Sequence, residues 1–127
     1  MGPEKEAGNV PPGRGSLYMC TQNAEDDKMA STEVKFDQID ISNGLEWSLD
    51  STVFYYIDSL KKKVVAFDFN MDSGNLTNKR TIYDSALEGV NGFPDGMTID
   101  IRGHLWVAFY GGACVSLVNY FGPSWSF

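Results

Sequence analysis

Apolar and polar residues alternate along most of this chain with the period of two that is typical of β-strands. Leu45, Trp47 and Leu49 share one face of a strand predicted over Asn43–Leu49. Val53–Asp58 (VFYYID) is nearly continuous in apolar and aromatic residues, which indicates a strand buried on both faces. Further strands are predicted at Gly15–Cys20, Val34–Ile39, Val64–Phe69 and Thr77–Tyr83.

Polar segments separate these strands. Thr21–Ser31 is a hydrophilic connection, and a three-lysine turn at Lys61–Lys63 and the turn Asp72–Asn75 predict tight hairpins. The first fourteen residues, rich in Gly, Pro and Glu, are predicted to be loop. Since no window of about eleven residues carries a 3.6-residue apolar stripe, the chain is predicted to be all-β, in antiparallel hairpins.

One pattern occurs twice, at an offset of 52 residues (95 minus 43). Asn43–Asp50 (NGLEWSLD) and Asp95–Arg102 (DGMTIDIR) both begin with a polar residue and Gly, then alternate apolar and polar positions. Val53–Ile57 then aligns with Leu105–Phe109 without a gap. Each copy holds about four strand-length segments, which is typical of a β-propeller blade.

The repeat predicts a partial β-propeller of about two and a half four-stranded blades. In this interpretation Gly15–Cys20 and Val34–Ile39 are the last two strands of a preceding blade. A closed propeller has about four to eight blades, each covered by its neighbours. Blades without neighbours leave apolar sheet faces uncovered, so we expect self-association through these faces.

Charge and composition exclude several classes of function. The 127 residues carry a formal net charge of −7, which disfavours binding to nucleic acid or to an anionic membrane surface. There is no apolar run of about 18 residues and no apolar segment typical of a secretory signal. We therefore expect a cytoplasmic protein in which Cys20 and Cys114 are reduced thiols.

Asn43 and Asp95 are the candidate functional residues, because they occupy the same place in the two repeats. Each stands just before an inner strand and is followed by Gly, and inner strands line the channel of a propeller. Their oxygen atoms would suit Ca²⁺ or Mg²⁺, with Zn²⁺ and Mn²⁺ also possible. The alternative is that Asn-Gly and Asp-Gly are turn dipeptides.

Whole strings of this sequence resemble the SMP-30/gluconolactonase/luciferin-regenerating enzyme family. The resemblance is carried by Phe36–Asp50 (FDQIDISNGLEWSLD), Phe54–Leu60 (FYYIDSL), Pro94–Asp100 (PDGMTID) and Gly103–Gly112 (GHLWVAFYGG). It implies a six-bladed propeller with a divalent metal in its central channel, hydrolysis of small sugar lactones such as gluconolactone, and a role in calcium handling. It covers residues 1–115, whereas residues 116–127 form a divergent C-terminal tail.

The resemblance also implies roles for single residues. The family residues that match Asn43 and Asp95 are metal ligands, and the Asp also serves as the general base. Glu4 matches a glutamate that contacts substrate, although a solvated acidic residue is the alternative at this position. The expected function is thus a metal-dependent lactone hydrolase that binds calcium, impaired in this shorter chain. The alternatives are a calcium-binding regulatory protein without catalysis and a non-functional partial product.

Two other sequence features are expected to be structural. His104, the single histidine, is expected in a surface turn, because no partners for a catalytic triad accompany it. Asp68–Gly74 imitates a calcium-binding EF-hand loop, but its Gly is one place late and the twelfth position is Lys79 rather than Glu. We therefore expect no EF-hand at this hairpin.

Overall fold

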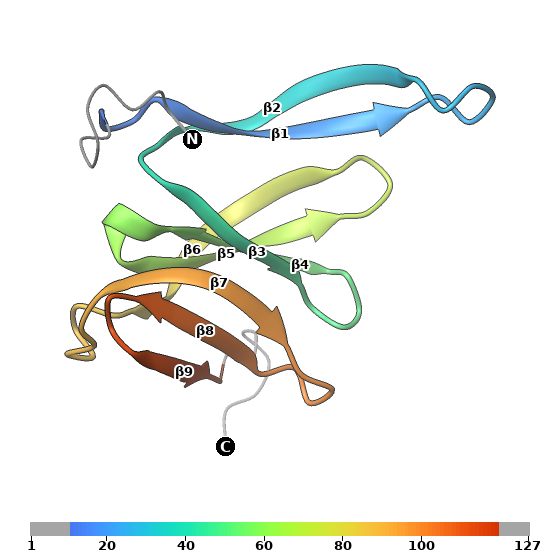
Figure 1. Cartoon of the computed structure of the whole chain (residues 1–127). Coiled ribbons are helices and arrows are strands. Elements are labelled where there is room, and N and C mark those ends of the chain that lie inside the picture. The colour runs from blue at the N-terminus through green and yellow to red at the C-terminus, as the bar shows by residue number, and fades with distance from the viewer. Residues whose placement is uncertain (1–10, 120–127) are drawn as a thin grey trace. The chain divides into compact units, whose positions relative to one another are not determined.

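The computed structural model describes residues 11–119, which contain nine β-strands and one 3-10 helix. The strands form three separate antiparallel sheets (Figure 1). Contacts divide the chain into two units, one ending at Ser42 and the other beginning at Asn43. Within the described residues no helix is long and apolar enough to cross a membrane.

The first unit is a single long hairpin of β1 (Gly15–Gln22) and β2 (Met29–Ile39). Both strands were predicted, but each extends into the segment expected to be a connection. The hydroxyl groups of Thr21 and Ser31 lie 2.6 Å apart across the hairpin. The expected connection is wrong in length because the backbone ladder needs no apolar side chains where both faces are exposed to water.

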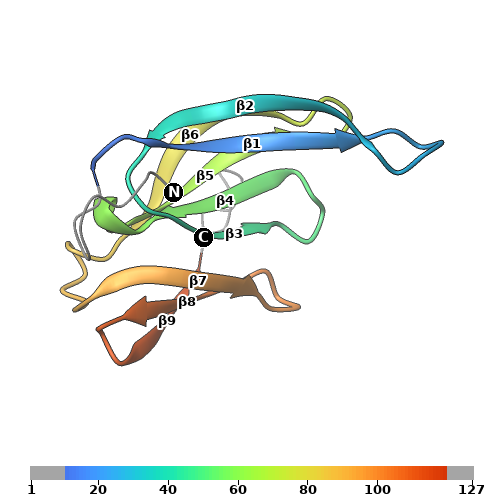
Figure 2. The same cartoon turned by 45° about the horizontal axis from the view of Figure 1, so that its top comes forward.

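The second unit holds two sheets that correspond to the two sequence repeats. The first has the order β3-β4-β5-β6 and the second the order β7-β8-β9 (Figure 2). The bounds of their elements are β3 (Ser42–Trp47), β4 (Val53–Asp58), η1 (Ser59–Lys61), β5 (Lys63–Asn70), β6 (Asn75–Asp84), β7 (Phe93–Ile99), β8 (Leu105–Tyr110) and β9 (Cys114–Val118). The predicted four-stranded blade is therefore confirmed, and β9 crosses the boundary expected after residue 115.

The core of the second unit lies between these two sheets. Buried side chains from both sheets form one apolar cluster: Tyr55, Ile57, Val64, Ala66, Leu105, Val107, Phe109 and Val118. Each large side chain of this kind stabilises the fold by roughly 1.5–3 kcal/mol when it is fully buried. Because successive residues of a strand face opposite sides, this cluster uses only one face of β4.

The opposite face of β4 is aromatic and also buried. Phe54 and Tyr56 are both buried, and their rings stack with centroids 6.2 Å apart. Trp47 of β3 packs against Phe54 at 5.0 Å and against Phe69 of β5 at 5.9 Å. The apolar run of β4 is thus buried on both faces, as its sequence predicts.

The carboxylate of Asp100, which accepts several hydrogen bonds, stabilises the turn between β7 and β8. Asp100 accepts hydrogen bonds from the backbone N–H groups of Arg102 and His104, at 2.8 and 3.0 Å. Its second oxygen lies 3.1 Å from both His104 Nδ1 and Trp106 Nε1. Desolvation acts to raise the pKa of Asp100, but these hydrogen bonds outweigh it and lower the pKa to about 2.

We expect this carboxylate to make folding stability depend on pH. The folded pKa is depressed below the unfolded value of about 3.9, so its contribution is complete above that value and is lost as pH falls toward 2. The urea midpoint of unfolding should therefore change less with pH between about 2 and 4 in Asp100→Asn than in the parent chain. Asp50 and Asp84, whose pKa values are also lowered, should contribute to the slope that remains. Equal slopes in variant and parent would contradict this role.

Gly44 of β3 makes a close backbone approach to β7 of the other sheet. A Cβ atom at this position would lie 2.7 Å from the Asp95 carbonyl oxygen and 2.9 Å from the Met97 nitrogen, both in β7. These distances are shorter than real contacts allow, so a side chain at Gly44 would force the backbone of β3 or β7 to move. At Gly96, one residue beyond the equivalent Asp95 in the repeat, a Cβ would meet nothing within 4 Å. Gly44 is therefore required by a close backbone contact, whereas Gly96 is not.

We expect Gly44→Ala to destabilise the chain by about 1–3 kcal/mol, the usual cost of overpacking. Gly96→Ala, the matched control, should change stability by less than about 1 kcal/mol, because its methyl group enters open space. Urea denaturation followed by tryptophan fluorescence measures both. Equal effects of the two substitutions would contradict the close approach of β3 and β7.

Candidate functional site

The two candidate residues lie at the start of equivalent strands. Asn43 is the second residue of β3 and Asp95 is the third residue of β7, and each strand is the first of its sheet. Both side chains are half-buried. The Asn-Gly and Asp-Gly pairs stand within strands, so the alternative that they are turn dipeptides is wrong.

The close approach at Gly44 brings the backbones of these two positions together. Without a side chain, Gly44 leaves room for the Asp95 carbonyl to lie against β3. Consequently Asn43, next to Gly44, and Asp95 stand on neighbouring strands where the two sheets meet. The structure therefore brings together the two residues that the repeat singled out.

A β-bulge interrupts the pairing of β7 with β8 at Asp95. Pro94 pairs with Phe109 and Met97 pairs with Val107, so Asp95 and Gly96 together oppose the single residue Ala108. A bulge of this kind bends the strand and changes the direction of a side chain. No described residue forms a hydrogen bond or ion pair with the Asp95 carboxylate, which leaves its oxygens available to a ligand.

A buried hydroxyl joins the two strands at this point. Asn43 Nδ2 donates to Ser59 Oγ at 3.0 Å, and Ser59 Oγ donates to the Pro94 carbonyl at 2.6 Å. Ser59 is the first residue of η1, directly after β4. The role of Ser59 is not predictable from the sequence, because a serine after a strand has no motif that distinguishes it from an ordinary turn residue.

The donor atoms present fit a hard cation in chemistry. Asn43 offers an amide oxygen and Asp95 a carboxylate, and oxygen ligands of these types bind Ca²⁺ and Mg²⁺. They carry one formal negative charge between them. Within residues 11–119 no group of three His, Cys, Asp or Glu side chains is gathered as a metal site. Glu4, the expected substrate contact, lies outside the described residues.

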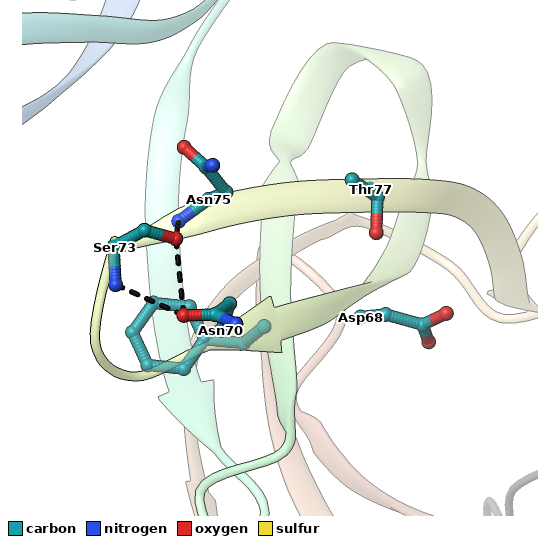
Figure 3. A pocket seen from close by; sticks show the side chains of 6 residues that line it. Asp68, Asn70, Ser73, Asn75 and Thr77 are labelled. Carbon is teal, nitrogen blue, oxygen red and sulfur yellow. Dashed lines mark hydrogen bonds between the residues drawn. The ribbon is translucent and has the colours of Figure 1, made fainter.

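The hairpin that imitates an EF-hand uses its oxygens for structure. This hairpin contains a pocket of about 290 Å³ (Figure 3), which is lined by Asp68, Phe69, Asn70, Ser73, Asn75 and Thr77. Asp68 accepts hydrogen bonds from Arg80 at 2.7 Å and from Asn78 at 3.0 Å. Asn70 Oδ1 accepts from the Ser73 nitrogen and hydroxyl at 2.9 and 3.0 Å. These oxygens stabilise the hairpin itself.

The histidine belongs to the turn at the opposite end of β7. His104 Nδ1 lies 3.1 Å from Asp100 Oδ2, and its backbone nitrogen donates to the same carboxylate. Asp100 follows the end of β7, whereas Asp95 stands near its start. His104 thus has the structural position that its sequence predicts.

The chain is similar in sequence to regucalcins of several vertebrates. The chain is 47% identical over 102 residues to regucalcin of Bos taurus, covering 80% of this chain and 31% of that protein. It is 55% identical over 80 residues to regucalcin of Homo sapiens, covering 63% of this chain and 26% of that protein. The chain therefore spans about a third or less of the length of these relatives.

Solved structures agree. A luciferin-regenerating enzyme matches with a TM-score of 0.66 and 38% identity over 67% of this chain and 28% of its own. Regucalcin of Agrobacterium tumefaciens, described as a calcium-binding protein, matches with a TM-score of 0.71 and 26% identity over 88% and 37%. These neighbours confirm the all-β fold and the partial propeller.

The family model described as the SMP-30/Gluconolactonase/LRE-like region matches residues 1–124, nearly the whole chain. Both repeats lie within that match, and so do the strands that carry Asn43 and Asp95. The chain belongs to the SMP-30/gluconolactonase/LRE-like family.

Proposed function

We propose that this chain is part of a metal-dependent sugar-lactone hydrolase of the gluconolactonase type that also binds calcium. The observation that carries the proposal is the juxtaposition of the Asn43 and Asp95 positions where β3 meets β7. Family membership supports the same chemistry, although the chain spans only 31% of the Bos taurus relative. The activity and substrate of a longer protein are therefore part of the proposal.

In this proposal Asn43 and Asp95 hold the cation and Asp95 also moves a proton. A divalent ion, when bound, polarises the lactone carbonyl and makes it a better electrophile. The Asp95 carboxylate accepts the proton of the water that attacks this carbonyl, so it acts as the general base. Glu4 contacts the substrate. Asn43 stays neutral and contributes only an oxygen ligand.

We expect calcium to be the ion that this donor set favours, with Mg²⁺, Mn²⁺ and Zn²⁺ as the other candidates. Hard oxygen donors without His or Cys suit calcium, and a similar solved protein is described as calcium-binding. Calcium takes about six to eight oxygen ligands, and Asn43 and Asp95 offer few of them. Residues 1–127 alone should therefore bind it weakly and hydrolyse lactones negligibly.

A calcium-binding protein without catalysis is the second candidate. The description of the Agrobacterium tumefaciens relative as calcium-binding favours it, since that description mentions no reaction. Asn43 and Asp95 would hold the ion in both cases. The candidates differ in whether a lactone is turned over, and a non-functional partial product would show neither property.

The decisive variant is Asp95→Asn in a longer chain that joins residues 1–127 to the missing blades of a regucalcin relative. The substitution removes the base and nearly preserves side-chain shape, so lactone hydrolysis should fall by about 10²–10⁴-fold. A pH indicator follows hydrolysis of gluconolactone with Ca²⁺, Mn²⁺ or Zn²⁺ added.

Asp72→Asn is the matched control, because it removes the same charge from an exposed turn between β5 and β6. It should leave the rate unchanged. An active Asp95→Asn variant would disprove the role of Asp95. Calcium binding without hydrolysis in the longer chain would favour the second candidate.

We further propose that the chain associates with a second copy of itself through the outer face of the β7-β8-β9 sheet. Trp106, Tyr110, Val115 and Leu117 are exposed there, with Tyr110 at 74% and Leu117 at 45%. Trp106 pairs with Leu117 across the strands, so the apolar residues are contiguous. The inner face of the same sheet is covered by another sheet, which supports a similar face-to-face contact between copies.

Leu117→Lys should shift the chain toward the monomer, because it places a charge on this apolar face beside Trp106. Leu87→Lys is the matched control, since Leu87 is 84% exposed in the connection between β6 and β7. Sedimentation velocity over a hundredfold range of concentration measures the assembly state. A parent chain that stays monomeric throughout would refute self-association.

A further inference from the structure

Ser59 makes two hydrogen bonds through one buried hydroxyl. Its exposure is only 5%, and its Oγ lies 3.0 Å from Asn43 Nδ2 and 2.6 Å from the Pro94 carbonyl oxygen. Asn43 is one of the two residues assigned to the cation, and Pro94 directly precedes the other. The hydroxyl therefore contacts both sides of the proposed site.

The direction of these bonds fixes the orientation of the Asn43 amide. A carbonyl oxygen is only an acceptor, so the single proton of the Ser59 hydroxyl goes to Pro94. Ser59 Oγ can then only accept a hydrogen bond from Asn43, and the nitrogen of the amide must face it. The other terminal atom, the ligand oxygen Oδ1, is directed away from Ser59.

We propose that Ser59 is a positioning residue, whose hydroxyl orients Asn43 so that Oδ1 and not Nδ2 is offered to the cation. This inference rests on the proposed function for its metal, while the orientation itself rests on the hydrogen bonds alone. Without the hydroxyl, no hydrogen bond from Ser59 favours one orientation of the Asn43 amide over the reversed one. A reversed amide would direct N–H groups toward the cation, which they cannot bind.

The sequence repeat separates this role from a general need of the fold. The residue 52 positions after Ser59 is Gly111 (59 plus 52), so the second blade is built without a hydroxyl at this place. Its partner position is Asp95, a carboxylate with two oxygens and no nitrogen. A carboxylate needs no selection between its terminal atoms. The serine thus accompanies the one amide ligand of the pair.

The orientation is tested without any metal by NMR of the 127-residue chain. We expect the Nδ2 protons of Asn43 to show an NOE to the Ser59 β-protons and shifts that differ from those of a solvent-exposed Asn, because Nδ2 donates to Ser59 Oγ. Ser59→Ala should weaken this NOE to residue 59 and move the Nδ2 proton shifts toward those of a solvent-exposed Asn, whereas Ser59→Thr, which keeps the hydroxyl, should retain both. Ser85→Ala is the matched control, because Ser85 is a fully buried serine that donates to the Lys62 carbonyl at 3.0 Å.

Titration with Mn²⁺ tests the consequence for the cation, since paramagnetic broadening detects even weak binding. Signals of Gly44 and Gly96 should broaden before that of Gly103, which stands in the turn after Asp100. We expect Ser59→Ala to raise the Mn²⁺ concentration for half-broadening at least tenfold. Ser59→Thr and Ser85→Ala should stay within about threefold of the parent, and unchanged core shifts would exclude unfolding.

The outcomes distinguish the inference from the proposed function. A Ser59→Ala variant that keeps both the Asn43 amide shifts and the Mn²⁺ response overturns the positioning role. A parent chain with an oriented amide but no selective broadening overturns the cation site, and with it the purpose assigned to the orientation. Selective broadening that depends on the Ser59 hydroxyl supports both.

Discussion

The candidate site depends on the close approach of β3 and β7 at Gly44. Blades of a propeller pack face to face, and side chains normally keep their backbones well apart. Here the absence of a Cβ lets the Asp95 carbonyl approach the first strand of the preceding sheet. The apolar cluster between the sheets and the hydroxyl of Ser59 hold this approach in place. The candidate site is therefore a consequence of packing as much as of its own residues.

The repeat made most of the second unit predictable from sequence. Alternation at Asn43–Leu49 and the apolar run at Val53–Asp58 placed β3 and β4, and the 52-residue offset carried the same assignment to β7 and β8. The alternation of apolar and polar side chains reflects burial of one face, so it does not reveal a strand whose two faces are both exposed to solvent. The ends of β1 and β2 escaped prediction for this reason, since their ladder depends on backbone hydrogen bonds that leave no trace in polarity.

The geometry of the candidate site was only half accessible to sequence. Equivalent positions identified Asn43 and Asp95, because identical places in a repeat become identical places in its blades. The bulge at Asp95 and the hydrogen bonds of Ser59 were invisible. Ser59 bonds to Asn43 and Pro94, which lie 16 and 35 residues away in sequence, and the bulge depends on how β7 pairs with β8. The alternation of apolar and polar residues encodes neither feature.

The two aspartates near the ends of β7 differ in how many hydrogen bonds their carboxylates accept. Asp100 receives four N–H groups, which satisfy its oxygens and lower its pKa to about 2. A carboxylate so fully bonded has little to offer a cation, because binding would require the loss of those hydrogen bonds. Asp95 has no such partner among the described residues, and the bulge there opposes two residues to one. Availability, rather than charge alone, is what distinguishes Asp95 from Asp100 and supports the proposal that Asp95 binds a cation and accepts a proton.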